Sequence, residues 1–384
     1  MVRPHPNRGA MSKGLGMNRV KKIGLGMAGV VALVLTQAVP AHADAQGRST
    51  DVVGIGSDTL QYAVDFLAEG SYLGDPGYNN THLNRRVVNL DATGDASGKT
   101  TAGATSVLRG GTFPVTRPNG SGSGITYILN TDTTAPFKAN YVRSSRLPNT
   151  GEQNTAVTKG YGGLHCYQIG LDGLQVAVSN LVTTNAGTGG ITVNDLVQIY
   201  SSTGTIRTWG QLPNYNGPTP SATIVPVVPQ SGSGTFTFFN DTLTAAAGGT
   251  FTMRSDAGLK VGEEHDPTLI QSDPNAIAPF STARLGMITN GYFNGGVVPN
   301  PVPVKLLGAP SFSVTRPILV LVRQNSVTNA SFDGLPAVWN DGKSWVNALF
   351  APGGFASNAL FASPLIADGA GFTYQYQDLG LCHS

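Results

Sequence analysis

The sequence predicts an α/β protein built as two lobes. Short runs of β-branched or apolar residues alternate with segments of helical periodicity, and this alternation is typical of layered α/β structure. The chain has 384 residues, and a chain of that length commonly divides into two lobes or domains. Glycines and prolines are spread among the elements, which indicates ordered connections rather than a disordered chain.

The N-terminal segment, residues 1–43, is predicted to be a signal peptide. Basic residues within 19–22 precede an apolar run over 23–35, and the small residues of 41–43 suit cleavage after Ala43. The apolar run is shorter than the roughly 20 residues that a transmembrane helix needs. No cysteine lies near the cleavage site, so a lipid anchor is not expected. The mature chain is therefore expected to be secreted, extracellular or periplasmic, without membrane insertion.

The charge of the mature chain argues against polyanionic partners. Residues 1–43 contain six basic residues and no acidic one, which leaves 18 Lys and Arg against 22 Asp and Glu, a net charge of −4. A nucleic-acid binder carries a basic face, so no nucleic-acid partner is expected. Binding of a small anion is not excluded, because backbone dipoles bind anions locally.

The two cysteines, Cys166 and Cys382, are predicted to form a disulfide. An isolated pair in an exported protein forms a bridge more often than it remains as two thiols. Only His165 and His383 lie nearby and there is no second cysteine pair, so a zinc site is not expected. No cofactor or metal is expected elsewhere in the chain.

Two glycine-rich turns near the start of the mature chain lead into predicted helices. A strand is expected at 51–56, and Ser57 is expected to cap the helix that the apolar spacing of 60–67 predicts. The Gly/Ser stretch 119–124 likewise precedes a helix-compatible run, 125–129.

Strands and helices alternate through the rest of the chain. Apolar or β-branched runs predict strands at 139–142, 171–179, 224–228 and 317–322. Helical spacing predicts helices at 192–200 and 236–247. Segments rich in Gly, Thr or Ala are expected to be loops at 43–50, 91–104 and 182–190.

The segment Glu263–Asp266 contains three acidic residues and a histidine. Such a cluster can bind a metal ion, but adjacent acids before a proline are more typical of a solvated loop, which is the preferred interpretation. Arg117 and Arg316 are each compatible with a position facing a cleft or with a role in surface or lobe packing.

Three Gly/Ser loops, 56–59, 120–124 and 231–235, each lead into the start of a predicted helix. The first N–H groups of a helix have no intrahelical acceptor, and the helix dipole makes that end partly positive. Glycine permits close approach of the backbone, and hydroxyls add donors, so such loops can bind a dehydrated anion. The strand end 143–146, Arg-Ser-Ser-Arg, adds guanidinium groups that suit an oxyanion. Each loop alone is more often an ordinary cap and turn than a binding loop.

An ordered set of motifs covering nearly all of the mature chain resembles the phosphate-binding proteins of ABC transporters. The motifs are GSDTL (56–60), RPNGSGSGI (117–125), YVRSSR (141–146), LDGLQVAVS (171–179), TWGQL (208–212), PQSGSGTFTFF (229–239), NAIAPFS (275–281), LGMI (285–288) and FSVTRPILVLV (312–322). The resemblance implies a two-lobe periplasmic-binding-protein fold of type II, the Venus-flytrap form, with a two-stranded hinge. The hinge crossings are expected near residues 165–175 and 310–322.

The resemblance also implies the domain organisation and the partners. Residues 44–168 are expected to form the first part of lobe 1, residues 169–310 to form lobe 2, and residues 311–384 to return to lobe 1. The implied function is that of a secreted solute-binding protein, a monomer that binds a small oxyanion between its lobes, with an ABC permease as a further partner.

The ligand-binding residues implied by the resemblance lie in the three loops and the strand end. They are Ser57, Asp58, Thr59, Ser121, Ser123, Ser144, Ser145, Arg146, Ser233, Gly234 and Thr235. The chain departs from the family pattern in two places. Ser145 stands where the family has an aspartate that accepts the proton of hydrogen phosphate, and Pro229 stands where the family has an arginine. Phosphate is the first choice of ligand, sulfate-like anions and organic phosphates are alternatives, and discrimination against sulfate is expected to be weak.

Two other function classes are weighed against transport binding. One is a surface interaction or sensing protein on the same fold, which the missing lipid anchor favours. The other is a secreted phosphate-ester hydrolase, but the Gly-x-Ser-x-Gly elbow of serine hydrolases is absent. The four histidines of the mature chain fall in no recognisable base or metal motif, so an enzyme is not expected.

Overall fold

The computed structural model describes residues 46–93 and 105–384. The predicted signal peptide, residues 1–43, and most of the expected loop 91–104 lie outside the described residues. Within the described part of the chain, no helix has the length and apolar character needed to cross a membrane.

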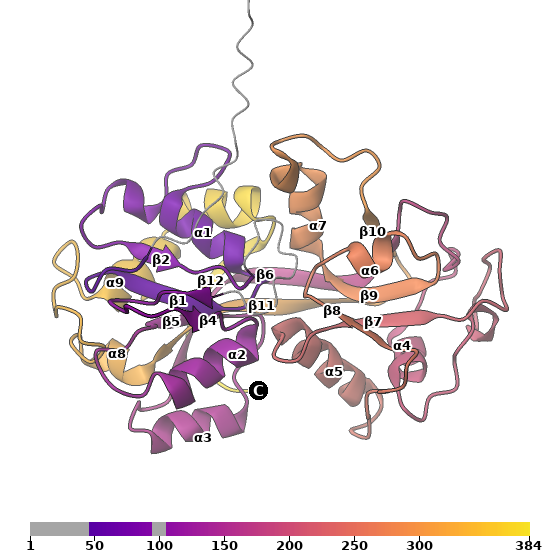
Figure 1. Cartoon of the computed structure of the whole chain (residues 1–384), viewed down its shortest axis with the longest axis horizontal. Coiled ribbons are helices and arrows are strands. Elements are labelled where there is room, and N and C mark those ends of the chain that lie inside the picture. Colours follow the sequence, from indigo (N-terminus) through magenta and orange to yellow (C-terminus); the bar gives the residue numbers. More distant parts are fainter. Residues whose placement is uncertain (1–45, 94–104) are drawn as a thin grey trace, which may run out of the picture. The chain divides into compact units, whose positions relative to one another are not determined.

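Most of the described strands join a single sheet of ten strands (Figure 1). The strands are β1 Val52–Gly56, β2 Val87–Asn89, β5 Tyr141–Ser144, β6 Leu164–Ser179, β7 Val225–Pro229, β8 Lys260–Gly262, β9 Ala276–Ser281, β10 Val304–Leu306, β11 Ser313–Arg323 and β12 Thr373–Leu381. Their order is β2-β1-β5-β11-β6-β9-β7-β8, and β10 and β12 also pair with β6. β3 Thr105–Ser106 and β4 Val115–Thr116 form a separate ribbon.

Two long strands, β6 and β11, connect the two groups of shorter strands. They pair antiparallel from Ser313 opposite Gln175 to Arg323 opposite Leu164, with one register shift between Ile318 and Leu319. β11 also pairs with β5, whereas the C-terminal half of β6 pairs with β9. Figure 1 shows both strands running between the two groups. β6 begins well before the expected strand 171–179 because its first half is also paired, with β11 and β12.

Helices cover both faces of the sheet. They are α1 Gln61–Glu69, α2 Ser121–Thr126, α3 Thr150–Thr158, α4 Val193–Tyr200, α5 Gly234–Ala246, α6 Thr268–Gln271, α7 Thr282–Thr289, α8 Gln324–Thr328, α9 Trp345–Leu349 and α10 Ala359–Ser363. In Figure 1, α1 and α7 lie above the sheet, and α2, α3 and α5 lie below it. Single-turn 3-10 and π segments complete the helical elements.

The hydrophobic core follows from the alternation of side chains along the strands. Val52 faces the cluster that contains α1, whereas Val53 faces the cluster that contains α2. Val320 and Leu321 on β11 divide between the same two clusters. The α1 cluster also contains apolar residues from the segment 335–372. The lobe boundaries near residues 168 and 310 stay a prediction.

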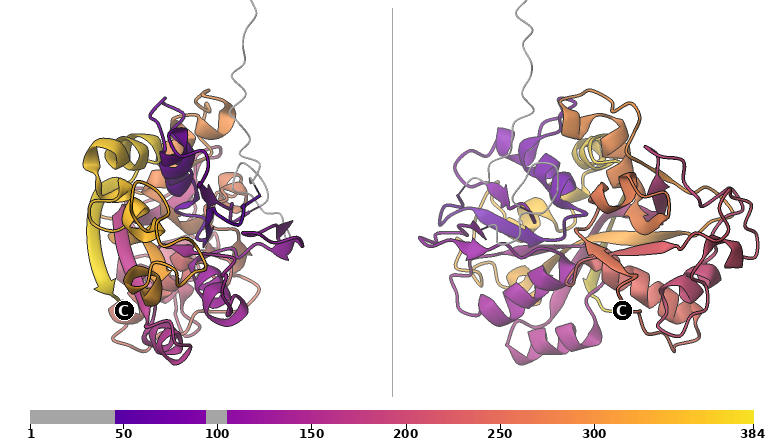
Figure 2. Two further views of the ribbon diagram at one scale, coloured as in Figure 1. Left: turned by 90° about the vertical axis from the view of Figure 1, so that its left-hand side faces the viewer. Right: turned by 45° about the vertical axis from the view of Figure 1, so that its right-hand side comes forward.

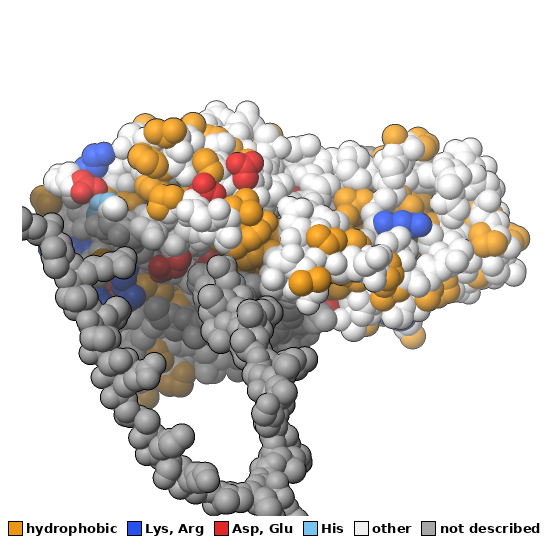
Figure 3. Space-filling model, turned by 90° about the horizontal axis from the view of Figure 1, so that it is seen from above, with side chains coloured by type: hydrophobic (Ala, Val, Ile, Leu, Met, Phe, Trp, Pro, Cys, Tyr) orange, Lys and Arg blue, Asp and Glu red, His pale blue; other side chains and the backbone are white. Residues whose placement is uncertain are grey.

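Many charged side chains are buried in the fold rather than displayed on its surface. Arg143, Arg316 and Arg323 are fully buried, although charged residues make up only 12% of the chain. The face seen from above in Figure 3 accordingly shows few charged side chains among uncharged and hydrophobic ones. No large patch of one sign is visible on that face.

The start of α1 differs from the sequence prediction. Ser57 does not cap this helix, which begins at Gln61 and has Leu60 at its cap position without a side-chain cap bond. The Ser57 hydroxyl instead accepts a hydrogen bond from the Thr59 N–H at 3.2 Å. A serine hydroxyl satisfies a backbone donor two residues later in a local turn, and this turn delays the helix by one further turn.

The predicted disulfide between Cys166 and Cys382 is confirmed, with a Cα–Cα distance of 5.9 Å. It joins β6 to the residue that follows β12, and Figure 2 shows that last strand lying along the edge of the sheet. The bridge closes a loop with a sequence separation of 216 residues. Long loops cost the unfolded chain the most entropy when they are closed.

We predict that Cys382→Ser lowers the free energy of unfolding by about 2–5 kcal/mol, because the unfolded chain loses its long cross-link. Guanidinium unfolding of the oxidised wild type and the variant, monitored by far-UV circular dichroism, measures the difference. Wild-type protein unfolded in the presence of reductant is the matched control and should behave like the variant. Equal midpoints for the oxidised wild type and the variant would contradict the prediction.

Candidate functional site

The candidate site is built around the loop between β7 and α5. Ser233 caps α5, since its hydroxyl accepts from the Phe236 N–H at 3.0 Å. Gly234 allows this helix end to lie against two serines, because a Cβ at that position would overlap Ser121 Oγ and Ser145 Oγ. Two of the three predicted loops, 120–124 and 231–235, therefore meet at the N-terminus of α5.

A buried ion pair on the two long strands lies beside this helix end. Arg316 on β11 and Asp172 on β6 are register partners and are at most 1% exposed. Arg316 Nε and Nη2 donate to Asp172 Oδ2 at 3.0 and 2.8 Å. Ser281 Oγ donates to the other carboxylate oxygen at 2.8 Å. The guanidinium is thus held by a fixed carboxylate on the neighbouring strand.

The Arg316 guanidinium also donates hydrogen bonds to two threonine hydroxyls and polarises them. Its Nη1 donates to Thr235 Oγ1 at 2.6 Å, and its Nη2 donates to Thr59 Oγ1 at 3.4 Å. A hydroxyl that accepts from a guanidinium still has its own proton to donate. Both hydroxyls can therefore donate their protons to an acceptor on the side facing away from Arg316.

The group on the other side is the carboxylate of Glu264. Thr235 Oγ1 donates to Glu264 Oε1 at 2.7 Å, and Thr59 Oγ1 donates to the same oxygen. Ser233 Oγ donates to Glu264 Oε2. Three hydroxyls from two segments far apart in the sequence thus converge on one oxyanion, next to the N-terminus of α5.

The expectation of a solvated loop at Glu263–Asp266 is wrong for its two central residues. Glu264 is 1% exposed and His265 is 5% exposed. The Glu264 N–H also donates to Gln230 Oε1 at 2.8 Å. Burial of the charge is tolerated because three hydroxyl donors and the helix dipole compensate for the lost water.

Asp58 takes part in a second buried network rather than pointing at the three hydroxyls. Its carboxylate contacts Arg284 Nη2 at 3.0 Å and His265 Nδ1 at 3.1 Å. Burial alone would raise the pKa of Asp58, but Arg284 and His265 together outweigh it and hold the pKa below 3.8. The Arg284 guanidinium also lies over the ring of Tyr62, 4.8 Å from its centroid.

Three further predicted residues, Ser57, Ser121 and Ser145, form a hydroxyl cluster beside Gly234. Ser57 Oγ donates to Ser145 Oγ at 3.4 Å, and Ser121 Oγ lies 3.4 Å from the same atom. Ser121 Oγ also accepts from the Ser145 N–H at 3.0 Å. The buried Arg143 holds this first loop in place, since its Nε donates to the Ser57 carbonyl at 3.0 Å.

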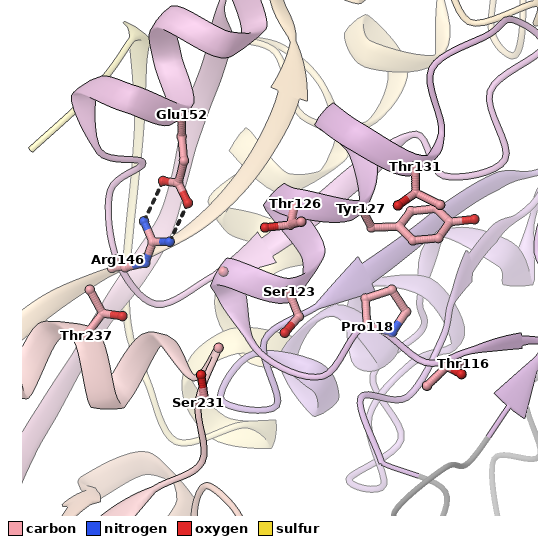
Figure 4. Close-up of a pocket in the computed structure, with 12 residues that line it drawn as sticks. Thr116, Pro118, Ser123, Thr126, Tyr127, Thr131, Arg146, Glu152, Ser231 and Thr237 are labelled. Atoms are coloured by element: carbon pink, nitrogen blue, oxygen red, sulfur yellow. Dashed lines mark hydrogen bonds and ion pairs between the residues drawn. The ribbon is translucent and has the colours of Figure 1, made fainter. Parts of the chain in front are cut away.

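The structure does not bring Ser123, Ser144 or Arg146 to the three hydroxyls. Arg146 forms a two-pronged pair with Glu152 at 2.7 and 2.8 Å, and Ser144 Oγ donates to the Arg146 carbonyl at 2.6 Å. Ser123 and Arg146 line an open pocket together with Ser231 and Gly232 of the loop before α5, shown in Figure 4 with the Arg146–Glu152 pair. Arg146 finds its partner six residues away on α3, so its guanidinium is already engaged.

Sequence reasoning missed Asp172, Arg284 and the roles of Glu264 and His265, and it left Arg316 undecided. The acidic loop was the one available signal. Across the described ranges, no group of three or more His, Cys, Asp and Glu side chains is placed to hold a metal ion.

The comparisons with known proteins place the chain in a family. A family model described as a PBP superfamily domain matches residues 89–291, which is more than half of the chain. The chain belongs to the PBP superfamily. Membership of this superfamily was predicted from the ordered motifs and is confirmed. No curated protein matches the chain.

Solved structures of similar fold include two from bacteria. One, from Clostridium perfringens, is described as a phosphate ABC transporter substrate-binding protein with bound phosphate; it has 16% identity and a TM-score of 0.50, covering 85% of this chain and 100% of that chain. An ABC-type phosphate transport receptor from Vibrio cholerae has 19% identity and a TM-score of 0.48, with the same coverage. At these identities the likeness concerns the fold. The predicted class, two-lobed α/β with a two-stranded hinge, is confirmed.

We predict that Asp172→Ala lowers the free energy of unfolding by about 3–5 kcal/mol, because it leaves the buried Arg316 guanidinium without its counter-charge. Urea denaturation followed by tryptophan fluorescence measures the loss. Lys260→Met is the matched control, since it breaks an exposed pair with Asp273 and is expected to cost about 0–1 kcal/mol. Equal losses for the two variants would contradict the role given to Asp172.

The lowered pKa of Asp58 predicts a pH-dependent stability. A carboxylate with a folded-state pKa below 3.8 stabilises the fold above that pH, and the contribution is lost as pH falls through the folded-state pKa. The wild type should therefore exceed Asp58→Asn in free energy of unfolding at neutral pH, and the gap should shrink as the pH is lowered below about 4. Denaturant titrations between neutral and acid pH measure the gap. A gap that stays constant with pH would contradict the assignment.

Proposed function

We propose that the chain is an extracytoplasmic solute-binding protein that binds a small oxyanion, inorganic phosphate in the first place, between its lobes. The observation that carries the proposal is the convergence of Thr59, Ser233 and Thr235 on a single carboxylate. Two of these hydroxyls are polarised by the buried guanidinium of Arg316. A set of donors that already surrounds one oxyanion has the chemistry to bind another.

The composition of the site supports phosphate as the ligand. Its donors are short hydroxyls and the N-terminus of a helix of 13 residues, which bind a desolvated anion with little loss of side-chain entropy. The serine cluster around Ser145 lies beside the same helix end and can add further donors. The similar Clostridium perfringens protein was solved with bound phosphate, and we extend that ligand to this chain.

We propose binding rather than catalysis. The histidine nearest the hydroxyls, His265, contacts Asp58 through Nδ1, and its Nε2 has no hydrogen-bond partner among the described residues. The hydroxyls of Thr59, Ser233 and Thr235 all donate to the same carboxylate, Glu264. Within the described part of the chain, none of the three is paired with a histidine, the arrangement that activates a serine or threonine nucleophile in hydrolases of the triad type.

The cellular role follows from the predicted signal peptide at residues 1–43. We propose that the mature chain acts outside the cytoplasm and delivers its ligand to an ABC permease. This role is supported by the family of the chain and by its similarity to the substrate-binding protein from Clostridium perfringens.

Isothermal titration calorimetry of the mature protein against phosphate, sulfate and acetate tests the proposal. We expect saturable binding of phosphate with one site per chain. If none of the anions binds, the oxyanion function is wrong and a surface interaction or sensing role takes its place.

We predict that Thr235→Val weakens phosphate binding by roughly tenfold or more, because a hydrogen bond to a charged group contributes about 1.5–3 kcal/mol. The variant keeps the shape of the side chain and removes the hydroxyl. Thr244→Val is the matched control, because its hydroxyl donates within the same helix to the Asn240 carbonyl at 2.8 Å. Titration calorimetry of both variants measures the change. A Thr235→Val protein that binds as tightly as the control would exclude this hydroxyl from the site.

A further inference from the structure

The three hydroxyls of the proposed site are fully engaged by the protein itself. Thr59 and Thr235 donate to one oxygen of the Glu264 carboxylate, and Ser233 donates to the other. A hydroxyl has a single proton to donate. The same three groups therefore cannot bind Glu264 and an incoming oxyanion at the same time.

The buried guanidinium groups beside the site already have partner carboxylates without a ligand. Arg316 pairs with Asp172, and Arg284 pairs with Asp58. Glu264 is the remaining buried carboxylate, and His265 Nδ1 lies 3.9 Å from it. A dianion placed beside Glu264 would meet a like charge in a site that excludes water, where the repulsion is least screened. Charge and hydrogen bonding thus lead to the same conclusion, that one of the two anions has to be absent.

Glu264 also makes the connections expected of a bound ligand. It bridges Thr59, which follows β1, to Ser233 and Thr235 at the start of α5. On the other side, the backbone N–H of Glu264 is held by Gln230 in the loop before α5. A tethered carboxylate of this kind joins the segments on the two sides of the site in the absence of any solute.

We infer that Glu264 is a built-in competitor that occupies the oxyanion site, so that a solute binds only when this side chain moves out. The inference rests on the proposed function and makes Glu264 the residue that sets affinity and selectivity. The apparent affinity for the solute is the intrinsic affinity multiplied by the fraction of molecules whose site is vacant, so a small vacant fraction means weak apparent binding. A carboxylate held by three hydroxyls leaves the site vacant in a minority of molecules, and the ligands favoured are those that attract the hydroxyls and Arg316 more strongly than a carboxylate does.

The test is titration calorimetry of phosphate binding to the mature wild type, Glu264→Gln and Glu264→Ala. We expect both variants to bind phosphate at least about tenfold more tightly than the wild type, with Glu264→Ala the tighter of the two. Glu263→Gln is the matched control, because Glu263 is the adjacent carboxylate and bonds to Asn119 instead of the hydroxyls. Its affinity should stay within about twofold of the wild-type value.

The outcomes separate the inference from the proposed function. If the wild type binds phosphate and both Glu264 variants bind it equally or more weakly, Glu264 is a ligand contact and the inference is overturned while the function stands. If neither the wild type nor any variant binds an oxyanion, the proposed function fails and the inference fails with it.

Hydrogen exchange on the unmodified protein gives an independent readout that does not depend on the folding of a variant. Displacement of the Glu264 carboxylate by phosphate removes the three side-chain bonds that hold this segment against Thr59 and the start of α5, so amide exchange across residues 263–266 should become faster when phosphate saturates the protein. Slower or unchanged exchange there at saturation would overturn the inference.

Discussion

The ion pair between Arg316 and Asp172 is the interaction on which the site depends. The two residues lie directly opposite each other on β11 and β6, the strands that join both groups of shorter strands. Because Asp172 fixes the guanidinium and Ser281 fixes Asp172, the remaining N–H groups of Arg316 point toward Thr59 and Thr235. The buried Arg316 guanidinium, whose charge Asp172 neutralises, thereby orients the hydroxyls of Thr59 and Thr235 as donors.

The surrounding structure can be understood as support for those donors. The helix end that carries Ser233 and Thr235 lies close to Ser121 and Ser145 only because Gly234 lacks a side chain, and Arg143 anchors the loop of Ser57 through its backbone carbonyl. Arg284 and His265 hold the pKa of Asp58 low, and the positive charge of Arg284 compensates the charge of this carboxylate. Glu264 then becomes the one oxyanion that the three hydroxyls bind. A site that assembles so many donors in a dry interior needs an anion, and here the chain supplies it.

The sequence predicted correctly those features that depend on residues close together in the chain. The glycine turn before α5 and the apolar runs of β7 and β11 follow from residues close together in the sequence, and so does the α/β class. Glu264 was missed because an acidic residue in a polar loop is normally exposed, and the groups that permit its burial include Thr59, distant in the sequence. Arg146 stays a predicted ligand residue, and what sequence reasoning did not show is that Glu152 nearby engages its guanidinium. Hydrogen bonds from residues distant in the sequence determine the position of Glu264, whereas a short-range ion pair determines that of Arg146.

The account makes one central claim, that Thr59, Ser233 and Thr235 form an oxyanion site under the control of Arg316. A crystal structure of the mature protein grown at saturating phosphate tests it most directly. The account predicts phosphate oxygens within hydrogen-bond distance of these three hydroxyls, with the Glu264 carboxylate withdrawn from them. Phosphate bound elsewhere, for instance beside Arg146 in the open pocket, with Glu264 still on the hydroxyls, would contradict it.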